Sequence, residues 1–200
     1  SKGLGCKLME QHSKRLFATA ISVFIIGFVG RIVLHDYPNF ETVMVASFLS
    51  ALVLPRNWTF VVTISMIVSS DIYLGYFGGS KIILFTYSGF LFVSLLTSKF
   101  KNNIKGGLKP GTVYKFGGAG ILVTLMYDIW TNFGVFLLTY NYTLDNLILV
   151  YVLGLPFMLY HLISSLVTFT LIGFPFYALF SQSMNNKLNI EDEVINYEQN

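Results

Sequence analysis

The chain has 200 residues, of which 54% are hydrophobic and only 12% are charged, and its mean hydropathy is +0.64. One soluble core cannot bury so large an apolar share, so the composition excludes a soluble globular domain and predicts an all-α integral membrane protein. Cys6 is the only cysteine, which excludes a disulfide framework and a multi-cysteine metal site. We therefore expect no cofactor and no metal, and the lipid bilayer is the first expected partner.

Apolar stretches recur along almost the whole chain and predict six transmembrane helices. The second and third are shorter than the roughly twenty residues that a perpendicular helix needs, and a turn at Pro55 separates them. Pro156 and Pro175 interrupt the overlong sixth stretch, whose first turns we expect to form a separate loop helix. The predicted spans are residues 16–33, 42–54, 58–70, 82–96, 116–139 and 147–180.

Basic residues are distributed unequally between the two sides of this predicted bundle. Six crossings put residues 1–15, the turn after the second span, the loop after the fourth and residues 181–200 on one side. That side carries eleven of the thirteen Lys and Arg residues, and only Arg31 and Lys81 lie opposite. The positive-inside rule then predicts a multi-pass protein of the cell membrane with both termini cytoplasmic. Residues 1–15 and 181–200 would be cytoplasmic segments, and residues 16–180 the membrane domain.

Acids, aromatic residues and glycines gather in the loops of the opposite, outer side. Arg31 begins the first outer loop, where it either clamps an anionic group or only extends its charge to the membrane surface. Residues 70–79 combine Asp71 with three aromatic residues and three glycines. This composition is typical of a pocket rim that stacks on a flat ligand, and equally of the aromatic belt at a membrane interface.

Asp128 lies near the middle of the fifth predicted span, where a carboxylate must face protein or water. It either contacts a substrate or cation, or it is a hydrogen-bonded acid that holds two helices together. Asn132 is four residues farther on and shares the same helix face, so both side chains can point into one cavity. His161 is the only histidine within a predicted span and is either a helix contact or a functional residue.

Sequence motifs of known enzyme classes are absent from the chain. It has no glycine-rich phosphate loop with its lysine, no His-Glu-x-x-His pair and no Gly-x-Ser-x-Gly elbow. The topology alone explains the basic loop, so we expect no binding of nucleic acid. We predict that the chain is not an enzyme. An intramembrane enzyme would require a reactive pair such as Asp128 and His161 in contact beside a water-filled cleft.

Four short segments, in this order, resemble an uncharacterised family of small bacterial membrane proteins with a Pro-Asn-Phe motif. They read HDYPNF at 35–40, SDIYLG at 70–75, TNFGV at 131–135 and LPF at 155–157. The six-span layout, the short second and third spans and the segment YDIWTN at 127–132 are similar to the substrate-binding S components of energy-coupling factor vitamin transporters.

The second resemblance implies an S-component-like bundle that captures a vitamin-like small molecule, while partner ATPases and a membrane coupling protein drive its uptake. In that family, small residues spaced by four on the first helix dock the coupling protein, and Ala18 and Ser22 hold the comparable places. Ligand contacts are expected at residues that match the family's outward pocket by region, and at the intramembrane acid. They are Arg31, Asn39, Asp71, Tyr73, Tyr76, Tyr87, Asp128 and Asn132.

A second class of function fits the same six spans. In this alternative the chain is a non-catalytic accessory or structural subunit of a larger membrane complex, such as a respiratory or monooxygenase assembly. The spans would then serve as packing surfaces, and Asp128 and His161 would contact a partner subunit or backbone. The identity of the subunits that copurify with the chain separates the two hypotheses.

Overall fold

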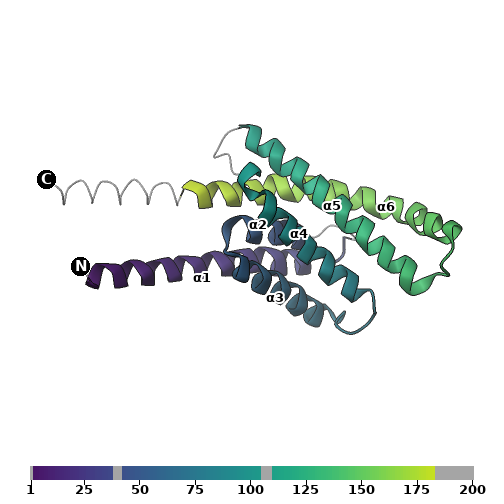
Figure 1. The fold of residues 1–200 in the computed structure, drawn as a ribbon, viewed down its shortest axis with the longest axis horizontal. Coiled ribbons are helices and arrows are strands. Elements are labelled where there is room, and N and C mark those ends of the chain that lie inside the picture. The colour runs from purple at the N-terminus through teal and green to yellow at the C-terminus, as the bar shows by residue number, and fades with distance from the viewer. Residues whose placement is uncertain (1, 38–41, 105–109, 183–200) are drawn as a thin grey trace.

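A computed structural model describes residues 2–37, 42–104 and 110–182, and this part of the chain consists of helices joined by short turns (Figure 1). The helices are α1 (Lys2–Val33), α2 (Val43–Val53), α3 (Arg56–Leu74), α4 (Ile83–Ile104), α5 (Pro110–Thr139) and α6 (Leu144–Thr168). A π-helical turn, η1 (Phe169–Gly173), follows α6, and α-helix then continues to residue 182. The described residues contain no strand, so the prediction of an all-α fold is confirmed.

Five helical segments are long and apolar enough to cross a membrane. They lie in α1, α3, α4, α5 and the continuous helix from α6 to residue 182. The remaining helix, α2, has 11 residues and is about 16 Å long, roughly half the thickness of the hydrocarbon core. A membrane-spanning helical bundle with a short second helix is therefore confirmed.

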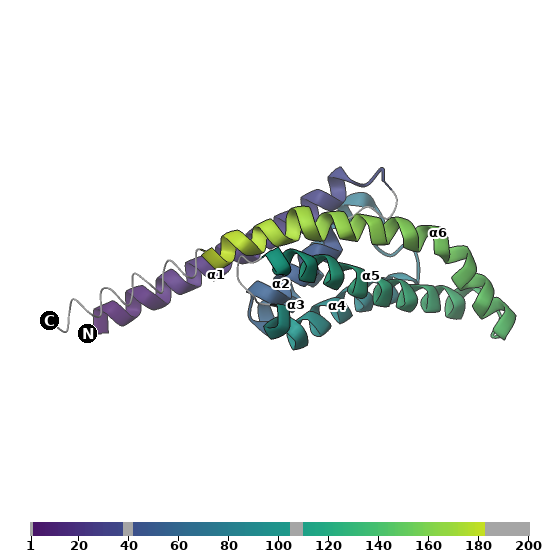
Figure 2. The same cartoon turned by 90° about the horizontal axis from the view of Figure 1, so that it is seen from above.

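Two predicted segments differ from the structure. The prediction of a short third span is wrong, because α3 has 19 residues and continues past Ser70 to Leu74. Its last turn carries Asp71, which has partners on other helices. The residues expected to form a separate loop helix are the first turns of α6 itself. Pro156 lies inside α6, and the helix changes direction along its first half (Figure 2). An internal proline removes one backbone donor and bends a helix without necessarily ending it.

The short helix α2 lies at the centre of the bundle. Ten of its 11 residues are buried, and it contacts each of the other helices. Ser50 Oγ lies 3.2 Å from Thr63 Oγ1 of α3, which lies 3.1 Å from Ser94 Oγ of α4. Ser94 Oγ also donates to the carbonyl oxygen of Ser47 at 3.3 Å. This chain of hydroxyl groups closes on α2 and holds it between α3 and α4.

Helices α5 and α6, with η1, pack as an antiparallel pair in one repeating register. Residues four apart on a helix share a face, so a contact recurs along the pair at each fourth residue. Small residues meet large ones near η1, and polar residues meet each other farther along. The contacts are Phe116 with Gly173, Gly120 with Phe169, Thr124 with Ser165 and Asp128 with His161. We call this line of contacts the α5–α6 seam.

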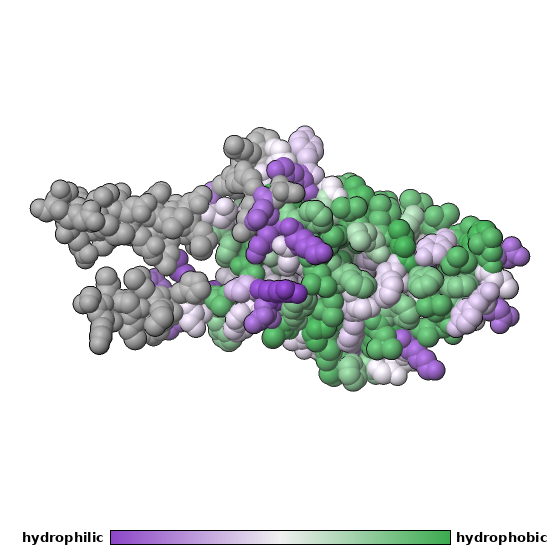
Figure 3. Space-filling view, viewed as in Figure 1, coloured by the Kyte–Doolittle hydropathy of each residue, from purple (hydrophilic) through white to green (hydrophobic). Residues whose placement is uncertain are grey.

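The first turns of α1 and the helix end at residue 182 lie at the same end of the bundle, which we call the terminal end (Figure 1, Figure 2). At the opposite, distal end, α1 and α3 end and α4 begins. On the face shown in Figure 3, hydrophobic residues cover most of the surface between two groups of hydrophilic residues. The side of the membrane on which the two termini lie, and the compartment that this side faces, stay predictions.

Close packing in the α5–α6 seam can be tested with two glycines of α5. A methyl group added to Gly120 would lie 2.7 Å from Cγ of Phe169, whereas at Gly118 nothing lies within 4 Å of the corresponding position. We expect Gly120→Ala to destabilise the bundle by about 1–3 kcal/mol, because the seam must open to admit the methyl group. Gly118→Ala should leave stability unchanged or slightly higher. Thermal unfolding in detergent, followed by circular dichroism, measures both variants, and equal melting temperatures would contradict the register.

Candidate functional site

Four side chains from three helices meet at the distal end, and we call Arg31, Ser70, Asp71 and Tyr87 the distal cluster. Nη2 of Arg31 lies 2.7 Å from Oδ1 of Asp71, and Nη1 of Arg31 donates to Oγ of Ser70 at 3.1 Å. The Tyr87 hydroxyl donates to Oδ2 of Asp71 at 2.8 Å. One carboxylate oxygen is thus paired with a cation, and the other accepts a hydrogen bond from a neutral group.

The order of the helices explains why these groups meet. Arg31 lies in the last turn of α1, Asp71 in the last turn of α3 and Tyr87 in the second turn of α4, so all three are at the distal end. The side chain of Asp71 is only 4% exposed, and that of Arg31 is 14% exposed. A carboxylate at this depth is costly unless it is paired, so the guanidinium and the phenol together compensate for its burial.

The turn after α3 folds back onto this cluster. Gly75, with a φ of 77°, ends α3 in the left-handed conformation that glycine adopts readily. The backbone N–H groups of Tyr76 and Phe77 donate to the Asp71 carbonyl oxygen at 2.8 and 3.2 Å. Nε2 of His35 lies 2.8 Å from the Tyr76 hydroxyl, and the two rings stack. The turn is therefore attached both to the end of α3 and to the segment that follows α1.

The structure brings together part of the predicted ligand set. The predicted residues in the distal cluster or in the turn attached to it are Arg31, Asp71, Tyr76 and Tyr87. Tyr73 is 67% exposed, and its ring lies edge-on to that of Phe28 on α1. Asn39 lies outside the described residues. The two predicted docking residues, Ala18 and Ser22, are exposed on α1.

Two further residues contact the predicted set but were not predicted as ligand residues. Ser70 accepts from an arginine 39 positions earlier in the chain, and His35 reaches a tyrosine 41 positions later. Both lie in the outer loop segments, which are rich in acids, aromatic residues and glycines. Pairings over such distances leave no local pattern, so only the fold identifies them.

Asp128 and Asn132 lie in the α5–α6 pair and contact α6. Oδ1 of Asp128 lies 2.8 Å from Nδ1 of His161, and the two residues are 8% and 4% exposed. The Tyr127 ring meets the imidazole edge-on. Asn132 packs against Gly154 of α6. A shared role of these residues with the distal tyrosines in ligand binding stays a prediction.

The contact between Asp128 and His161 meets one of the two conditions for an intramembrane enzyme. The second condition is a water-filled cleft beside the pair, and both side chains are buried. Among the described residues, no group of three His, Cys, Asp or Glu side chains is arranged to hold a metal ion. The chemistry that this geometry supports directly is a polar contact between two helices.

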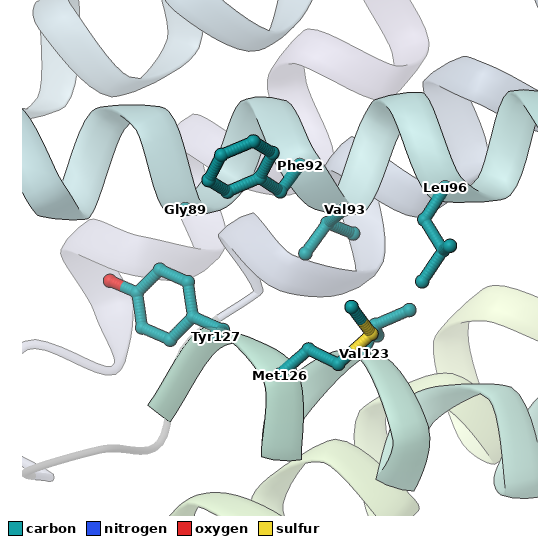
Figure 4. Close-up of a pocket in the computed structure, with 7 residues that line it drawn as sticks. All are labelled: Gly89, Phe92, Val93, Leu96, Val123, Met126 and Tyr127. Carbon is teal, nitrogen blue, oxygen red and sulfur yellow. The ribbon is translucent and has the colours of Figure 1, made fainter. Parts of the chain in front are cut away.

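Two hollows lie between α4 and α5. The smaller, of about 10 Å³, has an apolar lining that includes Val93 and Met126 (Figure 4), and its volume is close to that needed for one water molecule. The larger is an open groove of about 870 Å³. None of the described residues that we predicted as ligand contacts lines either hollow. Sequence reasoning missed the groove because its apolar lining reads like any lipid-facing helix surface.

A comparison with protein families matches residues 10–188 to one described as a family of unknown function (DUF6580). The chain belongs to this family. No curated protein and no solved structure matches the chain at a significant level. The resemblance to an uncharacterised family is thus confirmed, whereas the similarity to S components rests on the segments quoted above.

In the distal cluster, we expect a single and a double substitution to differ strongly in their effect on stability. Arg31→Met leaves the Asp71 carboxylate buried without its cation, and we expect a loss of about 3–5 kcal/mol in stability. Combining Arg31→Met with Asp71→Leu should restore most of that loss, because no charge is then left unpaired. Asp36, whose side chain is 91% exposed, offers a control, and Asp36→Asn should change stability by less than about 0.5 kcal/mol. Melting temperatures in detergent measure these effects, and additive losses in the double variant would show that the ion pair does not couple the helices.

Proposed function

We propose that this protein is a membrane-embedded substrate-capture subunit for the uptake of a vitamin-like small molecule, powered by partner ATPase and coupling subunits. The observation that carries the proposal is the distal cluster, in which a cation, a carboxylate and two hydroxyl groups converge from three helices. Ionisable side chains within membrane helices are costly and commonly mark substrate or ion sites. The quoted resemblance to S components supplies the class of ligand.

The groups in the cluster favour a ligand that carries polar groups of both kinds. The Arg31 guanidinium is planar and can bind a carboxylate or phosphate through two parallel hydrogen bonds. The Asp71 carboxylate can accept from an ammonium or a ring N–H group. A molecule with both features would replace the Arg31–Asp71 ion pair by two new pairs, one with each residue, and leave neither charge unpaired. Neutral or purely apolar molecules would gain nothing from this exchange.

Exposed aromatic residues beside the cluster support the same proposal. Tyr73, Tyr76 and Phe77 are 67%, 49% and 57% exposed. They surround a turn in which Gly75 and Gly78 have positive φ angles, and such glycines let a turn change conformation at low cost. Aromatic rings in this position can stack on a flat ligand. Capture then consists of a movement of the turn after α3, without any bond being broken.

Uptake requires energy, and the chain carries no nucleotide-binding motif that would supply it. We infer that partner ATPases hydrolyse the nucleotide and that a coupling protein docks on α1. Ser22 Oγ donates to the carbonyl oxygen of Ala18 at 2.9 Å, so this hydroxyl is satisfied within its own helix. Two small exposed residues on one helix face allow another helix to approach closely.

The alternative, a non-catalytic accessory subunit of a larger membrane complex, also has an observation in its favour. Two polar pairs among the described residues, Arg31 with Asp71 and His161 with Asp128, join helices of this chain to each other. Purely structural pairs would have the same geometry. Copurified subunits separate the two functions, because an accessory subunit would be isolated with non-transport proteins.

Ligand capture can be measured by native mass spectrometry of the protein purified from its own membranes. We expect a retained small molecule, and Asp71→Asn should lower its retention about tenfold or more, because a hydrogen bond to a charged group is lost. Asp145→Asn makes the same chemical change at an exposed position in the first turn of α6 and should leave retention unchanged. Absence of both a small ligand and an ATPase subunit would contradict capture for transport.

Docking on α1 makes a separate prediction about the partner. Replacing Ala18 and Ser22 together by leucine should lower the amount of copurified coupling protein about tenfold, because the bulkier side chains prevent close approach of the helices. Both residues are exposed, so the melting temperature should stay the same. Ile25→Leu, at a 49% exposed position of α1, is the control. If the doubly substituted chain retains the same amount of coupling protein, the docking face lies elsewhere.

A further inference from the structure

The groove between α4 and α5 opens on the outside of the bundle and has a volume of about 870 Å³. Phe92 and Leu95 of α4 line one side, Met126 and Ile129 of α5 line the other, and Tyr151 of α6 lies beside them. Its lining is predominantly apolar and aromatic, which is the usual lining of a small-molecule site. The groove therefore has the shape and the chemistry to hold an apolar chain.

A second hollow, of about 280 Å³, adjoins this groove toward the terminal end. Leu95 and Lys99 line both hollows, and the second also includes Arg56, Ser98 and Lys101. Among the described residues, no acidic side chain lines it. Figure 3 shows hydrophilic residues beside a hydrophobic surface on this face. Groove and hollow together form one surface that is apolar along the helices and basic at one end.

We propose that this surface binds one anionic phospholipid, with an acyl chain in the groove and the phosphate at the basic hollow. Arg56 begins α3, and Lys99 and Lys101 lie near the end of α4, so three cations converge from two helices. Basic pockets between membrane helices bind anionic headgroups, and Lys and Arg form charge-assisted hydrogen bonds with phosphate.

The charge pattern favours a phospholipid over a helix of a partner subunit. An acyl chain joined to a phosphate reproduces the order of the surface, from apolar groove to basic hollow. The cations lie at the terminal end of the bundle, which the positive-inside rule assigns to the cytoplasm. The cytoplasmic leaflet is the one that carries anionic lipids. None of the residues in this surface belongs to the distal cluster, so the inference stands independently of the proposed function.

The experiment uses the full chain in nanodiscs of equimolar phosphatidylcholine and phosphatidylglycerol, followed by extraction and native mass spectrometry. We expect phosphatidylglycerol to be retained in preference to phosphatidylcholine. Replacing Arg56, Lys99 and Lys101 by glutamine should lower its retention by roughly fivefold for each cation removed. Arg15→Gln removes the same charge from an exposed position of α1 near the terminal end and should leave retention unchanged.

Ile129→Trp tests the apolar part of the site without changing any charge. The indole should fill the groove and lower the retention of the phospholipid, while circular dichroism verifies that the variant is folded. Equal retention of the two lipids by the unmodified chain would overturn the proposal. The same conclusion follows if the triple variant loses no more lipid than Arg15→Gln. Loss of a bound protein subunit from Ile129→Trp, with lipid retention unchanged, would assign the groove to a partner instead.

Discussion

A helix of 11 residues reaches only about halfway across a bilayer, so its ends must find polar partners within the protein. This constraint on α2 organises the bundle. The other helices surround it, and hydroxyl groups join it to them: Thr42, which precedes α2, donates to carbonyl oxygens of α1, and Ser94 of α4 donates to the carbonyl oxygen of Ser47. Thr59 donates to Ser50 at the other end. The Ser and Thr residues of these spans, which lower their hydropathy, are the residues that make a buried short helix possible.

Buried polar groups also find partners on other helices at two other places, the distal cluster and the α5–α6 seam. In the distal cluster, a carboxylate is compensated by a guanidinium and a phenol that come from different helices. In the α5–α6 seam, Asp128 meets His161 and, one turn away, Thr124 meets Ser165 at 2.6 Å. The seam depends on helix register, because residues four apart must continue to face each other. Each of these pairings therefore depends on the position of a specific neighbour on another helix.

Hydropathy located most helices because a bilayer demands long apolar runs, and it also indicated that α2 is short. It ended the third span at Ser70, whereas the helix continues to Leu74 and carries Asp71, which pairs with Arg31, forty positions away. The position of Asp128 near the middle of a predicted span identified it as informative. Finding its partner, His161, required the register of α5 against α6. The groove left no signal at all. An apolar residue such as Ile129 reads alike whether the surface around it is flat or hollow.

The polar networks divide the bundle into two parts that are held together differently. Helices α1 to α4 are joined by the distal cluster and by the hydroxyl groups around α2, whereas α5 and α6 are joined by their seam. Between the parts, Nε1 of Trp130 donates to Oγ of Ser88 at 2.9 Å. Contacts between aromatic rings also join the parts, including those of Phe48 with Phe116 and Phe169. Aromatic surfaces can slide past one another, so among these contacts only the hydrogen bond from Trp130 to Ser88 would have to break. A movement of the α5–α6 hairpin would therefore change the shape of the groove before it disturbed either network. A molecule bound in the groove would oppose that movement.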